Sequence, residues 1–210
     1  MNLRRRQLEE QQARREGRLP PGQSLTVKFP ILHYGEIPGF DPATWHFRIW
    51  GEVENELTWN WDEFMQLPRT KVILDVHCVT RWSKLDTLWE GVSIRQLINS
   101  GILTLKPEAA FVIQHAEYGY TTNLPLKTVL QENFLLATHY NGSPLTPDHG
   151  FPLRAVVGFM PGKKPHKTPY FWKGAKWLRS LEFAAKDHPG FWEQAGYHNE
   201  ADVWREQRRA

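Results

Sequence analysis

The spacing of short apolar runs along the chain most constrains its fold. Six segments show the aromatic and β-branched content, or the alternation of apolar and polar residues, that is typical of strands. The helical patterns between them are too short to be the crossover helices of a doubly wound parallel sheet. The strand segments are 45–53, 71–79, 109–116, 133–140, 152–159 and 175–184. The sequence therefore predicts an α+β fold that is dominated by strands, with short helices and irregular loops.

Local signals place the short helices and one tight turn. Capping residues, apolar spacing and proline or glycine stops predict short helices within 58–68, 93–101 and 123–131. Asn141 followed by Gly142 is a strong signal for a two-residue hairpin turn.

The chain has 210 residues, enough for one substantial core, and shows no internal repeat or low-complexity linker. We expect a charged N-terminal arm over residues 1–19, either helical or frayed, and a single domain over 20–210. The Gly- and Pro-containing bridge 158–172 is expected to be a surface loop. No apolar segment follows the N-terminal arginines, and no run is long enough to span a membrane, so we expect the cytoplasm.

Cys78 is the only cysteine in the chain, and this count excludes an intramolecular disulfide, a four-cysteine iron–sulfur cluster and a zinc ribbon. The strand pattern places it on one face with Val72, Leu74 and Val76, and places His77 on the opposite face. Three interpretations follow from the residue alone: a buried small residue, a thiol nucleophile, or a metal ligand. The last requires a cofactor to supply the other ligands, because one side chain cannot hold a metal tightly.

The distribution of charge is more informative than the net charge of +3. No Asp or Glu occurs from His149 to Leu181. The cations of this acid-free segment are Arg154, Lys163, Lys164, Lys167, Lys173, Lys176 and Arg179. Such a run forms either a solvated basic face or a pocket for an anion, most naturally a phosphate.

Four ordered stretches carry a resemblance to a known family. "DVHCVTRWSKLDTLWEGVSIRQLI" resembles the cofactor-binding segment of the sulfite oxidase family of molybdenum enzymes. "FPILHYGEIPGFDPATW" and "YGYTTNLPL" are similar to its entry and pterin-contacting segments. "DHGFPLRAVV" with "KGAKWLRSLEF" resembles its paired phosphate- and pterin-binding stretches. The match covers roughly residues 20–205 and implies the strand-dominated, molybdopterin-binding fold of that family.

The resemblance implies a molybdenum–molybdopterin cofactor with Cys78 as the metal ligand. Arg81, three residues past this ligand, would by its proximity steer an anionic or polar substrate toward the metal. Tyr120, or Tyr118 in its place, would donate a hydrogen bond to a metal-bound oxygen. The residues implied in contact with the pterin or its phosphate are His33, Tyr34, Thr122, Asn123, His149, Arg154, Lys173 and Lys176.

The implied activity is two-electron oxygen-atom transfer on a small oxo-substrate such as sulfite or a sulfoxide. Electrons would pass to or from a separate donor or acceptor protein, because one cysteine cannot build an iron–sulfur cluster. We expect a monomer with no membrane insertion and no nucleic acid partner. The alternative from another class is a basic, non-catalytic module that binds nucleic acid or an anionic partner. A thiol enzyme and a protein that keeps the fold without the cofactor are further alternatives.

Overall fold

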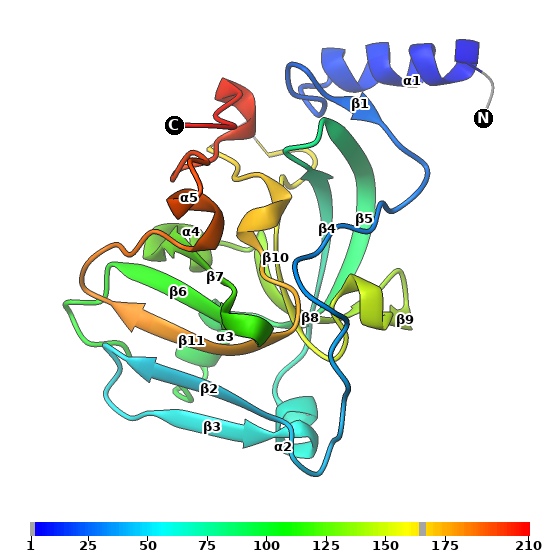
Figure 1. The fold of residues 1–210 in the computed structure, drawn as a ribbon. Helices are drawn as coiled ribbons and strands as arrows, with labels where there is room; N and C mark the ends of the chain where they lie inside the picture. The colour runs from blue at the N-terminus through cyan, green and yellow to red at the C-terminus, as the bar shows by residue number, and fades with distance from the viewer. Residues whose placement is uncertain (1–2, 164–166) are drawn as a thin grey trace.

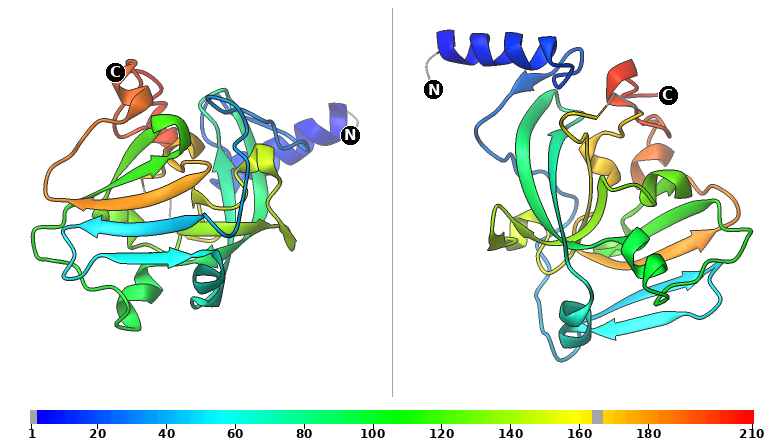
Figure 2. Two further views of the ribbon diagram at one scale, coloured as in Figure 1. Left: turned by 60° about the horizontal axis from the view of Figure 1, so that its bottom comes forward. Right: turned by 180° about the vertical axis from the view of Figure 1, so that it is seen from behind.

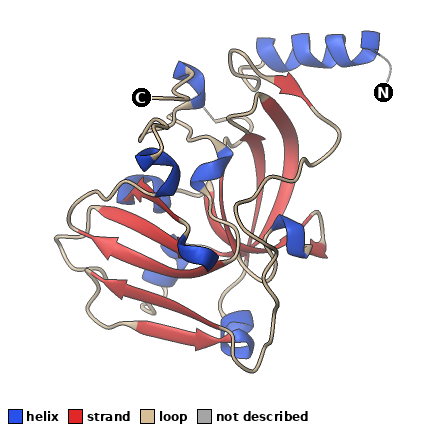
Figure 3. Ribbon diagram, in the orientation of Figure 1, coloured by secondary structure: helices blue, strands red, loops and turns tan. Residues whose placement is uncertain are grey.

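The computed structural model describes residues 3–163 and 167–210 (Figure 1). Its strands form two sheets, and all helices except the first are short (Figure 3). The prediction of a strand-dominated α+β fold is confirmed.

The first sheet carries the hairpin that presents Cys78. Its strand order is β1-β5-β8-β10, with β4 also paired to β5 and β9 also paired to β8. β4 and β5 are antiparallel, and the tight connection between them contains Cys78. The strands of this sheet are β1 (Ser24–Leu25), β4 (Thr70–His77), β5 (Trp82–Val92), β8 (Phe134–Tyr140), β9 (Ser143–Pro144) and β10 (Arg154–Val157).

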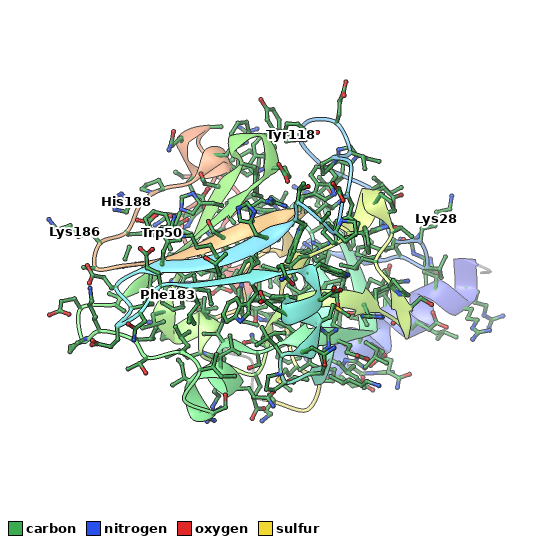
Figure 4. The ribbon with its side chains drawn as sticks, turned by 90° about the horizontal axis from the view of Figure 1, so that it is seen from below. Lys28, Trp50, Tyr118, Phe183, Lys186 and His188 are labelled. Atoms are coloured by element: carbon green, nitrogen blue, oxygen red, sulfur yellow. The ribbon has the colours of Figure 1, made fainter. Side chains whose placement is uncertain are left out.

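The second sheet has the order β3-β2-β11-β6-β7. β11 runs parallel to β2 and antiparallel to β6. Trp50 and Phe183 mark the neighbouring strands β2 and β11 in Figure 4; Phe183 is fully buried and Trp50 is half-buried. The strands are β2 (His46–Gly51), β3 (Leu57–Asn60), β6 (Phe111–Ala116), β7 (Thr121–Pro125) and β11 (Leu178–Ala184).

Capping residues fix the ends of the short helices. Asn60 and Glu63 form a reciprocal capping box at the start of α2, and the Ser93 side chain caps α3. The helices are α1 (Leu3–Arg15), α2 (Trp61–Gln66), α3 (Ile94–Asn99), α4 (Leu126–Val129) and α5 (Phe191–Gln194). Single 3-10 turns occur at Glu117–Gly119, Pro147–His149, Phe171–Lys173 and Val203–Arg205. Among the described residues, no helix combines the length and apolar character needed to cross a bilayer.

The core lies on both faces of β8 and β10. Leu136 belongs to the larger cluster, which contains Phe47 and Phe183 of the second sheet. Its neighbour Leu135 points to the other face and joins Val76 in a smaller cluster. Strands buried on both faces read as continuous apolar runs, which explains why "FLLA" and "AVV" show no alternation.

The N-terminal arm is a docked helix, one of the two forms expected for it. Arg18, just beyond α1, makes two hydrogen bonds of 2.8 and 2.7 Å to the buried carboxylate of Asp75 in β4, and a third of 2.6 Å to Asp86. Both chain ends lie at the same end of the molecule (Figures 1 and 2).

Two local predictions need correction. The longest strand, β5, was not predicted, and neither were β3 and β7. The bridge 158–172 is not simply a surface loop: Phe159 pairs its backbone with Asp75 of β4, and Tyr170 is fully buried beside Val203. Residues 164–166 of this bridge, with Lys164 among them, lie outside the described residues.

Candidate active site

A cavity of about 350 Å³ lies beside the turn between β4 and β5. The turn contributes Cys78 and Thr80, β10 contributes Arg154, and the segment before β11 contributes Lys176. This volume lies within the range of small-molecule and cofactor sites. The other lining residues are Phe29, Pro30, Leu32, His33, Tyr34, Val79, Trp82, Glu117, Tyr120, Phe171, Trp172, Gly174, Trp177, Trp192 and Tyr197.

Cys78 is the first residue after β4, and it presents its sulfur to the cavity while being only 6% exposed. The Thr80 hydroxyl donates a hydrogen bond of 3.2 Å to the sulfur. Burial raises the pKa of the Cys78 thiol, while the hydrogen bond from Thr80 and the cation of Arg208 act in the opposite direction. The His77 imidazole faces away and lies 2.8 Å from the Ser83 hydroxyl, so it cannot serve as a base for this thiol.

Arg154 and Lys176 are two cations beside the cavity that lack a carboxylate partner. Among the described cations of the acid-free segment, each of the others pairs with a Glu, whereas these two do not. Arg154 donates to the His149 carbonyl (2.9 Å), and Lys176 donates to the Asp148 carbonyl (2.6 Å). Burial lowers the pKa of Arg154 to about 9, and burial together with the Arg154 cation lowers the pKa of Lys176 to about 7. An anion in the cavity would offset both effects.

Aromatic rings complete the surroundings of this cation pair. The Arg154 guanidinium lies 4.4 Å from the centre of the Phe171 ring and 5.6 Å from that of Trp89. Gly174 passes so close to β10 that an added Cβ would lie 2.5 Å from the Ala155 carbonyl oxygen. A side chain at this position would therefore clash with the backbone of β10.

Three of the predicted cofactor contacts, Thr122, Asn123 and Lys173, lie in a separate buried network. The Lys173 ammonium forms an ion pair with Glu193 and donates to the Asn123 side chain at 2.7 Å. The Thr122 hydroxyl donates to the same Glu193 oxygen at 3.1 Å. None of the three is among the residues that line the cavity. In this structure their polar atoms are directed at α5 and the segment that follows it.

The remaining predicted residues are distributed around the cavity. His33 and Tyr34 line it, whereas His149 lies behind Phe29, with ring centres 4.1 Å apart. Tyr120 also lines it, but its hydroxyl donates to the Trp172 carbonyl at 3.1 Å, and burial raises its pKa. Arg81 is exposed at the end of the turn and is not a lining residue.

The aromatic wall was not predicted residue by residue. Trp82, Trp172, Trp177, Trp192 and Tyr197 all line the cavity, and the last two come from the C-terminal segment. The ten tryptophans of the composition were the available signal, but composition alone does not say which of them meet.

Over residues 3–163 and 167–210, no three His, Cys, Asp or Glu side chains gather closely enough to hold a metal ion. Cys78 could therefore anchor a metal only if a cofactor supplied the other ligands. A thiol and two uncompensated cations around one cavity suit a cofactor that carries both a metal and a phosphate.

Comparison with known proteins identifies the family. The family model "Oxidoreductase molybdopterin binding domain" matches residues 34–192, and the chain belongs to this family. The oxidoreductase YuiH of Bacillus subtilis is 45% identical over 198 residues, which cover 94% of each chain. The chain is thus an oxidoreductase of the sulfite oxidase type that uses a molybdenum–molybdopterin cofactor, as predicted, and its basic segment does not make it a non-catalytic module.

More distant relatives share only part of their length with this chain. The catalytic subunit MsrP of the protein-methionine-sulfoxide reductase of Campylobacter jejuni is 27% identical, and the match covers 73% of this chain and 54% of MsrP. Mitochondrial sulfite oxidase of Rattus norvegicus is 22% identical over 85% of this chain and 37% of its own length. The solved structure of the sulfane dehydrogenase SoxCD from Paracoccus pantotrophus shares the fold, with a TM-score of 0.61, 19% identity and coverage of 74% of this chain and 42% of that one.

Proposed function

We propose that this cavity holds the molybdenum–pterin cofactor and that the protein transfers an oxygen atom to or from a small oxo-substrate. The observation that carries this proposal is the meeting of three groups in one cavity: the Cys78 thiol and the cations of Arg154 and Lys176. When bound, the cofactor supplies the two-electron redox change and the site of oxygen transfer.

The chain's own residues would bind, orient and shield this cofactor. The Cys78 sulfur must lose its proton to ligate a metal, because the thiolate is the ligand form. Arg154 and Lys176 would bind the phosphate, since both lie at the cavity with spare hydrogen-bonding capacity and neither forms an ion pair with a described carboxylate. The Phe171 ring, 4.4 Å from the Arg154 guanidinium, would shield that cation from water and so strengthen its attraction to the phosphate.

Between the two substrates considered, the lining favours an uncharged sulfoxide over sulfite. Arg154 and Lys176 are assigned to the phosphate, and Arg81 is not part of the wall. The remaining lining side chains are mainly aromatic and include the carboxylate of Glu117. An inorganic oxyanion would have no cation of its own in such a site, whereas an apolar sulfoxide could pack against the rings.

The finer assignments concern the partner and the compartment. We propose a separate electron-transfer protein as the partner, because MsrP is itself named a catalytic subunit. We also propose a monomer that works in the cytoplasm. The single free cysteine is compatible with a reducing compartment.

The test is elemental analysis of the protein made in a host that loads other molybdoenzymes, beside Cys78→Ala and a Thr80→Ala control. Near-stoichiometric molybdenum and a fluorescent oxidised pterin in the parent, with metal loss in Cys78→Ala, would support the proposal. Thr80→Ala keeps the sulfur and should retain most of the metal. A parent protein without molybdenum and without pterin from such a host would refute it. Two separate assays of the loaded enzyme then decide the substrate: oxidation of sulfite with an electron acceptor, and reduction of a dialkyl sulfoxide with an electron donor.

A further inference from the structure

The turn that carries Cys78 is held from behind by both ends of the chain. The family model matches residues 34–192, so the segments that do this, 22–24 and 206–208, lie outside the matched region. They meet each other beneath the turn: a Cβ added at Gly22 would lie 2.4 Å from a carboxylate oxygen of Glu206 and 3.3 Å from the Arg208 guanidinium. Both ends of the chain are seen at this end of the molecule in Figure 2.

The N-terminal segment binds the turn through Gln23 and Ser24. The Gln23 side chain is 1% exposed, and its amide donates a hydrogen bond of 3.1 Å to the Cys78 carbonyl. Its carbonyl oxygen accepts a hydrogen bond of 3.1 Å from the Ser83 hydroxyl, on the far side of the turn. The backbone of Ser24 donates to the Arg81 carbonyl at 3.0 Å. Gln23 therefore ties the first and last parts of the turn together.

The C-terminal segment binds the same turn through Arg208. Its guanidinium donates a hydrogen bond to the Val79 carbonyl and lies 5.1 Å from the centre of the Tyr170 ring. Three carbonyls of the turn thus each accept a hydrogen bond from a terminal segment: those of Cys78, Val79 and Arg81.

The turn needs such support because its backbone is unusual. Arg81 has a φ of +72°, a left-handed conformation that residues other than glycine rarely adopt. Within the turn, Arg81 donates to the Cys78 carbonyl at 3.0 Å, and Cys78 donates to the Trp82 carbonyl at 2.8 Å. A strained backbone conformation persists only where its surroundings hold it in place.

We propose that Gln23 and Arg208 are positioning residues that fix the Cys78 sulfur at the cavity wall. Neither side chain lines the cavity, so each acts through the carbonyls of the turn and not through contact with cofactor or substrate. We call the hydrogen bonds from Gln23 and Arg208 to the turn the clamp. That the clamp supports a metal ligand rests on the proposed function, whereas the clamp itself does not. Substitution of either residue should let the turn open locally and expose the Cys78 thiol without unfolding the domain.

The test uses the cysteine as its own probe, because alkylation by iodoacetamide can occur at only one thiol in this chain. The full-length, cofactor-free protein is alkylated over a series of pH values, and labelling is followed by intact-mass spectrometry. The limiting rates at high pH are compared, because the Arg208 cation also lowers the pKa of the thiol. Gln23→Ala is expected to accelerate labelling roughly 3- to 10-fold, since one net hydrogen bond that opposes local opening is lost. Gln23→Glu keeps the acceptor for Ser83 but puts a carboxylate oxygen where the amide donated to Cys78, so it should accelerate labelling at least as much. Arg208→Ala should accelerate labelling about 10-fold or more, because its hydrogen bond comes from a charged group.

Two controls separate positioning from general destabilisation. Arg205→Ala removes an exposed cation from the same tail and should leave the labelling rate unchanged. Val129→Ala removes buried volume in α4, distant from the turn, and shows how much labelling rises for a given fall in melting temperature. Arg208→Lys retains a cation and a donor and should recover part of the protection.

The clamp would be overturned if Gln23→Glu and Arg208→Ala are labelled no faster than Val129→Ala predicts for the same fall in melting temperature. In the loaded protein, the same two variants should lose molybdenum on dialysis several times faster than the parent. A parent that contains no molybdenum would refute the proposed function yet leave the labelling result to decide the clamp by itself.

Discussion

Replacing Lys173 with methionine tests whether this residue stabilises the fold through a buried ion pair or binds the cofactor, as the family resemblance implies. In the structure its ammonium is buried and contacts Glu193, Asn123 and the Asn199 carbonyl. Lys173→Met leaves the Glu193 carboxylate buried with one hydrogen bond, from Thr122, while its second oxygen already lacks a partner among the described residues. Breaking one side of a buried ion pair costs about 3–5 kcal/mol of the free energy of unfolding. For a domain of this size the melting temperature should fall by roughly 6–20 °C.

Urea unfolding, followed by tryptophan fluorescence, measures this loss. Lys186→Met is the matched control, because Lys186 is exposed on the loop after β11 (Figure 4) and should change stability by less than about 0.5 kcal/mol. Lys173→Met combined with Glu193→Met removes both charges, and it should cost less than the sum of the single changes by about 1–3 kcal/mol.

The opposite result would support the role implied by the resemblance. In that result, the free energy of unfolding of Lys173→Met lies within about 1 kcal/mol of the parent's while the variant no longer retains the pterin cofactor. In that case Lys173 turns toward the cofactor in the loaded enzyme. The buried ion pair with Glu193 would then describe only the protein without its cofactor, and the structural reasoning above would be refuted.

Three further predictions rest on single observations. The pKa of Lys176 is lowered from 10.5 to about 7 in the folded protein. Between these pH values the folded protein therefore binds fewer protons than the unfolded chain. The melting temperature of the cofactor-free protein should rise with pH through this range. Lys176→Met should abolish that dependence, and a slope that persists in the variant would contradict it. Arg18→Gln leaves the buried carboxylate of Asp75 without its cation and should lower the free energy of unfolding in urea by about 3–5 kcal/mol. The loss should be smaller at acidic pH, where the carboxyl is protonated, and an equal loss at all pH values would count against this pairing. Gly91→Ala would place a Cβ 1.9 Å from the Leu136 carbonyl oxygen and should cost about 3 kcal/mol, and a loss below about 1 kcal/mol would show that β5 and β8 can separate freely.

The sequence predicted those parts of the fold in which side-chain pattern and turn chemistry agree. Asn141 and Gly142 adopt φ values of +48° and +82°, as the hairpin signal requires. β5 was missed because its polar residues and Gly91 disguise a strand that pairs with β4 across a tight turn but also with β1 and β8, which come from distant parts of the chain. Pairing of this kind is set by tertiary contacts, which no local window contains.

The site was predictable to the extent that charge and residue type identify it. The acid-free segment correctly marked a region of unusual cation content, but its cations divide in three dimensions. Lys163, Lys167, Lys173 and Arg179 pair with glutamates from elsewhere in the chain, whereas Arg154 and Lys176 remain without one at the cavity. Which cations are neutralised depends on the position of acids far away in sequence, and the pattern of a single segment cannot show this.

The same division explains why a chain with a net charge of only +3 can hold an anionic group. Affinity for a phosphate depends on the local potential in a water-excluded site and not on the sum of charges over the surface. Arg154 is buried against aromatic rings, and the pKa of Lys176 is lowered first by burial and then by the Arg154 cation. A phosphate bound beside the two cations would offset both of these costs of keeping them charged. Terminal segments that hold Cys78 from behind would let the metal end of the same cofactor meet a fixed ligand, so the two ends of the cavity would be prepared by different parts of the chain.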